Sequence, residues 1–349
     1  MGDAVESKTL VALGSRDARY QALRANEPGL GAFLDRFGTM FGERVTPTLI
    51  ARFEAGSRPT AEEVISFRNA IALPVLLKAW ADLSRSRQNA GALFAEYFEI
   101  HPAMTSSDGQ SVVVNAEAYR DLRFGLGGFH GQAPAAIDPR HVKATFDPLL
   151  RTALVALLDA ESLSEEPERF RQRVLTSMKF AMRAMRAPSD SLSDTSDWAA
   201  MVSMWVSAFE ALSHPGGDAK VDFPEVSSRI KKTPWISQEL TDLKHQAINR
   251  KPGELTTLPV QTYGRIYKLR NDCLHGVRHF QSGGLEEDQD AAWGQLQIQA
   301  PVLYRSVLLS SLADAGHCEG WEDSGDPLTG WRQREFEAPL FKPWADRDE

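Results

Sequence analysis

The chain is poor in cysteine, with only Cys273 and Cys318 among its 349 residues. Two cysteines cannot form the disulfide network that small secreted domains need, and the N-terminus does not combine a basic start with an apolar segment and a cleavage site. Long apolar runs are also missing: residues 70–77 form the longest, far short of the roughly 20 residues that span a bilayer. We therefore expect a cytoplasmic protein with no membrane partner.

Positive charge is scarce as well, because the net charge is −8. A protein that binds phosphate backbones normally carries a basic surface. The shortage is uneven, however: residues 168–280 contain 17 Lys and Arg against 12 Asp and Glu. This locally basic segment indicates either solvated helix faces or a path that attracts a polyanion.

The residues that are present predict a mainly α protein. At 42% hydrophobic and 25% charged, the composition is globular, and the length suggests two domains. In the first, residues 1–160, we predict helices over residues 30–41, 48–55 and 60–83, the last kinked at Pro74. A strand is expected within residues 109–116 and a glycine-rich loop over 125–139, so this mostly helical domain contains a small β element.

A second domain, residues 168–315, is predicted to be a helical bundle. The first domain ends with a helix that Asp147 and Pro148 begin and that ends near residue 160; an acidic connector to the second domain follows. Amphipathic spacing then predicts helices over residues 169–187, 197–213, 224–232, 236–249, 260–275 and 287–315, the last restarted at Pro301. The C-terminal tail, residues 316–349, is expected to wrap on the body.

Arg270 is the residue that breaks the helical pattern. On a helical wheel it falls in the middle of an apolar stripe that contains Tyr263, Ile266 and Leu274. A guanidinium stays charged, so this position requires a carboxylate, a phosphate, or an opening to a cleft or an interface. One interpretation is structural: Arg270 pairs with a carboxylate such as Glu210, and His275 caps the end of the helix.

A second interpretation comes from a resemblance. Residues 267–276, YKLRNDCLHG, resemble the signature of HEPN domains, in which an Arg followed by a polar residue precedes a His, with four to six residues between the Arg and the His; here four lie between Arg270 and His275. Residues 205–212, WVSAFEAL, resemble the helix that precedes this motif in the Apea-like branch of the superfamily. The resemblance covers residues 169–315 and not the N-terminal half.

The resemblance implies a metal-independent endoribonuclease that works as a homodimer without a cofactor, with RNA as its substrate. In the catalytic set that it implies, His275 takes the proton of a ribose 2′-OH and Arg270 stabilises the phosphate charge. Asn271 orients the imidazole or a substrate oxygen, and Glu210 holds Arg270. The product is a 2′,3′-cyclic phosphate. A regulatory protein partner and a role in prokaryotic defence or as a toxin follow from the resemblance alone.

Other interpretations remain open at this point. The HEPN domain could be a catalytically silent dimerisation module, with Glu210 in a plain ion pair and Asn271 on the surface. Residues 46–74 loosely resemble the second half of a Cro-like helix-turn-helix, although three acidic residues there cancel three basic ones. His275, His279 and Cys273 lie close in the chain, but Gly276 separates the histidines and no C-x-x-C is present, so no metal is expected.

Overall fold

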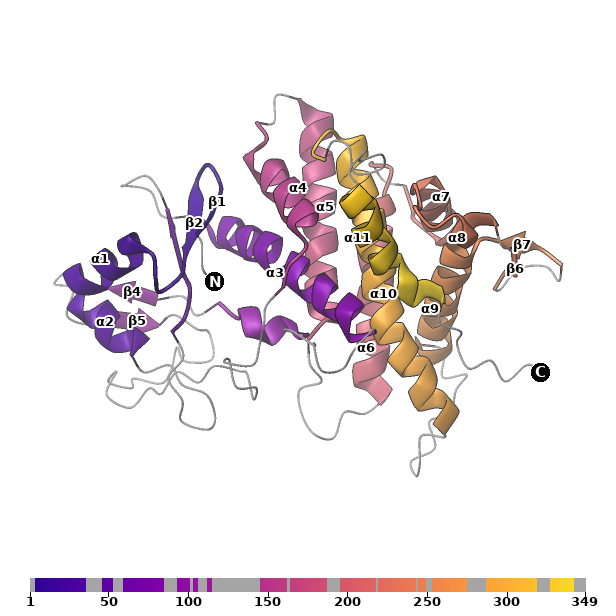
Figure 1. The fold of residues 1–349 in the computed structure, drawn as a ribbon, viewed down its shortest axis with the longest axis horizontal. Helices are drawn as coiled ribbons and strands as arrows, with labels where there is room; N and C mark the ends of the chain where they lie inside the picture. The colour runs from indigo at the N-terminus through magenta and orange to yellow at the C-terminus, as the bar shows by residue number, and fades with distance from the viewer. Residues whose placement is uncertain are drawn as a thin grey trace. The chain divides into compact units, whose positions relative to one another are not determined.

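The computed structural model describes residues 4–35, 46–52, 59–84, 93–100, 103–105, 112–114, 145–161, 164–186, 195–217, 219–242, 244–248, 253–274, 287–318 and 327–341. The fold is mainly α, with a few short strands, which confirms the predicted class (Figure 1). The chain divides into two compact units: residues 1–71 and 96–143 form unit 1, and residues 72–95 and 144–349 form unit 2. The boundary expected near residue 160 falls inside unit 2.

Unit 1 contains a three-stranded antiparallel sheet in the order β1-β2-β3. Strands β1 (Val5–Glu6) and β3 (Leu49–Arg52) flank β2 (Leu10–Leu13), whose four residues are all buried. Two helices, α1 (Ala18–Asn26) and α2 (Pro28–Leu34), follow β2, and Asp17 caps the first of them by accepting from the Arg19 backbone N–H. The core of this part combines both kinds of element: Val11, Leu13, Tyr20, Phe33 and Leu34.

The sheet corrects two expectations. Residues 49–52 are a strand, where we predicted a helix over 48–55, because they pair with β2 from Leu10↔Arg52 to Leu13↔Leu49. An apolar run this short carries no periodicity that separates strand from helix, so its pairing partner decides. The helix-turn-helix interpretation loses its recognition helix at the same place. The predicted helix over 30–41 is described only to Asp35, and α2 begins earlier, at Pro28.

The strand expected in residues 109–116 is confirmed as β5 (Val112–Val114), which pairs with β4 (Ala103–Thr105). The loop predicted over 125–139 lies outside the described residues. Helix α3 (Ala61–Leu83) runs through Pro74. In the described part of the chain, α3 alone is long and apolar enough to cross a membrane, but 78% of its most apolar window is buried inside the protein, as in a core helix.

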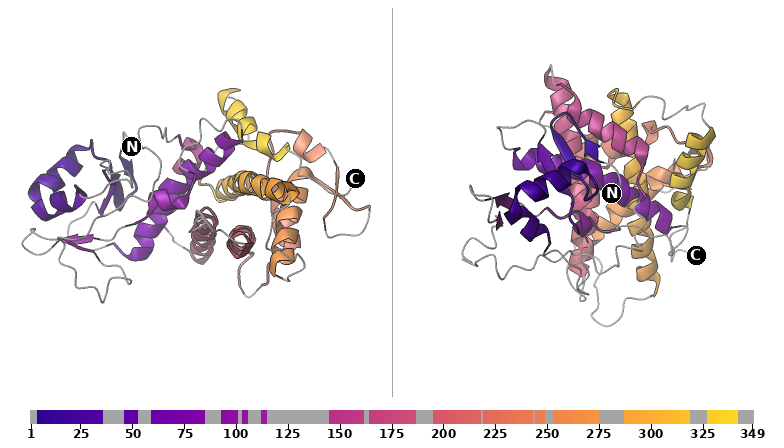
Figure 2. Two further views of the ribbon diagram at one scale, coloured as in Figure 1. Left: turned by 90° about the horizontal axis from the view of Figure 1, so that it is seen from below. Right: turned by 60° about the vertical axis from the view of Figure 1, so that its left-hand side comes forward.

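Unit 2 is a helical bundle. Helices α5 (Glu165–Ala184) and α6 (Thr195–Ser213) pack side by side, and the left view of Figure 2 shows them nearly end-on. Around them lie the remaining helices of this unit: α4 (Pro148–Asp159), α7 (Phe223–Lys232), α8 (Glu239–Asp242), α9 (Leu258–Leu274), α10 (Glu287–Asp314) and α11 (Pro327–Glu337), with the short η5 (Ala338–Phe341). The short η2 (Ala95–Phe98) falls at the boundary between the two units.

A buried hydroxyl contact joins three of these helices. Ser177 of α5 donates to the backbone carbonyl of Ala208 in α6, at 2.7 Å. Its oxygen also lies 2.8 Å from the hydroxyl of Tyr304 in α10. Since Ser177 has a single hydrogen to donate, Tyr304 must be the donor in this second bond. These hydrogen bonds connect α5, α6 and α10 in addition to their apolar packing.

A buried ion pair connects the other side of the bundle. Asp147 caps α4 by accepting from the backbone N–H groups of Leu149 and Leu150, and its other oxygen accepts from Arg305 of α10 at 2.7 Å. Both charged side chains are almost fully buried. Arg305 also donates to Gln333 of α11, and its guanidinium lies 4.0 Å from the ring centroid of Phe336. This cluster makes α4 and α11 parts of the bundle.

Two predictions for unit 2 were wrong: a helix over residues 236–249 and a restart of the last helix at Pro301. Residues 236–249 were expected to be helical, but only α8 is; a hairpin of β6 (His245–Gln246) and β7 (Leu255–Thr256) follows, with Gly253 at a φ of 86°. The carboxylate of Glu337 accepts from the N–H groups of Ile236 and Ser237, so these two donors are satisfied outside a helix, in the bend that precedes α8. Helix α10 also continues through Pro301, because its buried side chains compensate for the lost hydrogen bond.

The Asp147–Arg305 pair gives the first prediction. Replacing Arg305 by Ala should lower the free energy of unfolding by about 3–5 kcal/mol, because it leaves a buried carboxylate without its partner. Arg169→Ala is the matched control, since Arg169 is half-exposed and pairs with Glu165 one turn away; it should cost less than about 0.5 kcal/mol. Urea denaturation measures both. Similar losses in the two variants would contradict a special role for the buried pair.

Candidate functional site

Helices α6 and α9 bring together two residues that the sequence singled out. The nearest charged atoms of Arg270 and Glu210, Nη2 and Oε1, lie 3.7 Å apart. This is within ion-pair range but longer than a hydrogen bond. Both side chains keep some exposure, 21% for Arg270 and 25% for Glu210. The expected pairing partner of Arg270 is therefore in place, but the pair is loose.

Aromatic rings form the floor under this pair. The guanidinium carbon of Arg270 lies 4.5 Å from the ring centroid of Tyr267, one turn earlier on α9. Tyr263, a further turn back, is fully buried between Phe209 of α6 and Phe223 of α7, with centroid distances of 5.2 and 5.6 Å. Cation–π contact and a rigid floor thus hold the guanidinium on the apolar side of the helix.

Two polar atoms here have no hydrogen-bond partner in the described structure. They are Nε of Arg270 and the hydroxyl of Tyr263, both buried. A buried donor without a partner costs free energy, and a charged one costs more. Arg270 is therefore incompletely satisfied by Glu210, which is the condition expected of a group that awaits another oxygen ligand.

The electrostatics of Glu210 are dominated by burial. Burial raises the pKa of the Glu210 carboxyl above its usual value, the charge of Arg270 opposes this shift, and the carboxylate of Asp222 adds to it. Burial, with the negative charge of Glu210, also raises the pKa of Tyr263 well above the usual tyrosine value. Because the pKa of Glu210 is raised overall, the attraction of Arg270 is smaller than the free-energy cost of burying the charged carboxylate.

Asn271 lies in a groove beside this pair. The groove has a volume of about 360 Å³ and is lined by the start of α7, a residue after β6 and the last turns of α9; its residues are Phe223, Pro224, Ile248, Tyr267, Lys268, Asn271 and Asp272. Tyr267 is shared between the groove and the floor under Arg270. Of the predicted site residues described here, Asn271 lines the groove, whereas Arg270 and Glu210 do not; Arg270 is connected to it through its contact with Tyr267. His275, the fourth predicted residue, lies outside the described residues, as does Gly276.

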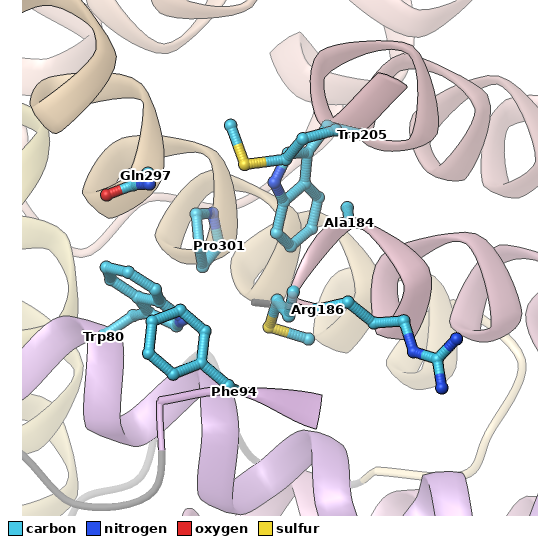
Figure 3. Close-up of a pocket in the computed structure, with 9 residues that line it drawn as sticks. Trp80, Phe94, Ala184, Arg186, Trp205, Gln297 and Pro301 are labelled. Carbon is cyan, nitrogen blue, oxygen red and sulfur yellow. The ribbon is translucent and has the colours of Figure 1, made fainter. Parts of the chain in front are cut away.

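An internal cavity elsewhere in unit 2 does not compete with this groove. It is lined by Trp80, Phe94, Trp205 and Pro301, among others, and the Arg186 side chain extends away from it (Figure 3). Its volume of about 20 Å³ has room for one water molecule. Among the described residues, no three His, Cys, Asp or Glu side chains gather as a metal site requires.

The second prediction concerns Glu210. A carboxyl whose folded-state pKa is raised binds its proton more tightly in the folded than in the unfolded protein, so it favours folding at low pH and this contribution is lost as the pH rises through the folded-state pKa. When the pH is lowered from 7 to 4, the free energy of unfolding of the wild type should therefore rise relative to that of Glu210→Gln, which does not titrate at this position. Urea denaturation of both proteins at the two pH values measures this change. A relative gain by the variant at low pH would instead indicate a strong ion pair with Arg270.

No family model, curated protein or solved structure matches this chain. The resemblance of residues 169–315 to HEPN domains therefore stays a prediction from the sequence motifs.

Proposed function

We propose that unit 2 is a HEPN-type endoribonuclease that cleaves RNA without a metal ion. The observation that carries the proposal is the state of Arg270: a permanent charge held on the apolar side of α9 over Tyr267, with a loose carboxylate partner and an unpartnered Nε. A guanidinium with free donor capacity suits the non-bridging oxygens of a phosphodiester. The groove beside it, which contains Asn271, gives an RNA strand room to approach.

In this proposal the reaction is an internal transesterification. His275 takes the proton from the ribose 2′-OH, and the 2′ oxygen attacks the adjacent phosphorus. The bond from phosphorus to the 5′ oxygen breaks, and this oxygen takes up a proton as it leaves. The products are a 2′,3′-cyclic phosphate and a 5′-hydroxyl end. Arg270 stabilises the charge on the phosphate, while Glu210 acts as a positioning residue for Arg270.

The third prediction tests this chemistry. Purified protein should cleave single-stranded RNA or transfer RNA in EDTA and leave cyclic phosphate ends, and His275→Ala should lower the rate by at least about 100-fold through loss of the general base. Arg270→Lys keeps the charge but loses the planar donor pattern, so it should also lower the rate strongly. Lys232→Gln, which removes an exposed charge at the end of α7 and does not line the groove, is the matched control. Cleavage that persists in His275→Ala would contradict the assignment.

We also propose that two chains pair through α9. Leu274 lies one turn after Arg270 on the same face and is 59% exposed, so the apolar stripe of α9 continues from the core into solvent. A second copy of the chain that packs on this stripe would bury Leu274 and bring two Arg270 side chains to one cleft.

The fourth prediction is that the protein sediments as a dimer and that Leu274→Asp produces a monomer with little nuclease activity. Leu255→Asp is the matched control, because Leu255 is 60% exposed on β7, away from the end of α9. Sedimentation velocity, with thermal unfolding as a check of folding, distinguishes the two variants. A Leu274→Asp protein that remains a dimer would exclude this interface.

A second candidate function is a catalytically silent interaction module. The observation in its favour is the Arg270–Glu210 contact itself, which is sufficient to explain a charged residue at this position. It predicts that Arg270→Lys leaves partner binding intact and that no RNA is cleaved under any condition of the assay above.

A further inference from the structure

A second groove of unit 2 lies where α5 begins and α6 and α10 end. Its volume, about 440 Å³, is in the range of pockets that hold small molecules. Phe170 and Leu212 form an apolar wall of this groove. The polar lining comes from separate elements and includes two arginines and two histidines: Arg173, Arg229, His214 and His317. Its residues do not overlap with those of the Asn271 groove.

Each arginine in this groove is only partly satisfied. Arg173 pairs with Glu166 at 3.1 Å, and Arg229 pairs with Asp314 at 2.6 Å. Both carboxylates are mostly exposed, 67% for Glu166 and 58% for Asp314, so they can turn into water at little cost. Nη1 of Arg173 and Nε of Arg229 are buried without a hydrogen-bond partner. Two arginines that line one groove thus each keep a donor that no acceptor of the described residues satisfies.

Neutral donors at the end of α6 add to this capacity. Nδ1 of His214 accepts from the backbone N–H of Gly216 at 2.9 Å, so the neutral ring carries its proton on Nε2, which is a donor. The hydroxyl of Ser213 is buried without a partner. Gly216 has a φ of 103°, and a Cβ at this position would lie 3.6 Å from Nη1 of Arg173. The turn after α6 therefore lies next to the Arg173 guanidinium.

The geometry points to a binding site for a phosphate monoester in this groove. Two guanidinium groups match a dianion in charge, and donors from α5, α7 and the end of α6 suit a tetrahedral group better than a planar carboxylate. The groove is larger than a phosphate group, which leaves room for an organic part against Phe170 and Leu212. When the ligand enters, its oxygens replace Glu166 and Asp314 as partners of the arginines. This site is independent of the proposed nuclease site.

Isothermal titration calorimetry of the full chain tests this site with four probes: AMP, ribose 5-phosphate, inorganic phosphate, and adenosine as the unphosphorylated control. We expect the phosphorylated probes to bind and adenosine to give no signal. Tighter binding of a monoester than of inorganic phosphate would show that the organic part contacts the apolar wall, whereas equal affinity would identify the free ion as the ligand. If no phosphorylated probe binds, the proposal is wrong.

Two variants with opposite expected effects on phosphate affinity test whether the ligand binds in this groove. Arg173→Gln should weaken phosphate binding by at least about tenfold, because it removes a charge-assisted hydrogen bond. Glu166→Gln should tighten binding severalfold, since it removes the carboxylate that competes for Arg173. Arg169→Gln, one turn earlier on α5 and paired with Glu165, should change nothing. Binding that is the same in wild type, Arg173→Gln and Glu166→Gln would exclude this groove, and Glu166→Gln keeps the test valid if Arg173→Gln does not fold.

Discussion

The architecture of unit 2 depends on one buried carboxylate. Asp147 is the N-cap of α4. Its backbone N–H donates to the carbonyl of Pro74 in α3, and its carboxylate accepts from Arg305 of α10. Arg305 in turn reaches Gln333 of α11. Because a buried charge of either sign is tolerable only with its partner, the pair couples the packing of α4 to that of α10, and the hydrogen bonds to Pro74 and Gln333 add α3 and α11 to the same cluster. Helix α10, fixed in this way, supplies the wall on which α6 and α9 pack.

The Arg270 pair differs from the Asp147 pair in a way that bears on function. Arg305 is held at hydrogen-bonding distance from its carboxylate and is almost fully buried. Arg270 lies farther from Glu210, is partly exposed and keeps a free donor, although ring stacking fixes its position. Geometry of the first kind stabilises a fold. Geometry of the second kind holds a charge ready for an exchangeable ligand. Arg173 and Arg229, in the second groove beside Phe170 (the Phe170 groove), lie at hydrogen-bonding distance from their carboxylates but also keep a donor atom without a partner.

Local signals made much of the bundle predictable. The Asp147–Pro148 start, the apolar stripes of α5 and α6 and the spacing along α9 depend on neighbours within a few residues. The pairing of Glu210 with Arg270 was predicted because the charge of Arg270 falls in the apolar stripe of α9 and requires a partner. The β2–β3 pairing, the 245–256 hairpin and the Glu337 contact did not follow, because each joins segments far apart in sequence. The Phe170 groove was missed for the same reason: no sequence motif links Arg173, His214, Arg229 and His317. The HEPN resemblance and the role of His275 stay predictions.

The spacing of the Asp147 cluster also has a consequence for synthesis of the chain. Asp147 and Arg305 are separated by 158 positions. At the usual elongation rates, roughly 8–30 s pass between the appearance of one residue and of the other. During that interval α4, α5 and α6 leave the ribosome without the helix that neutralises Asp147. The bundle therefore matures late in translation, and its apolar faces are exposed to chaperones until α10 arrives.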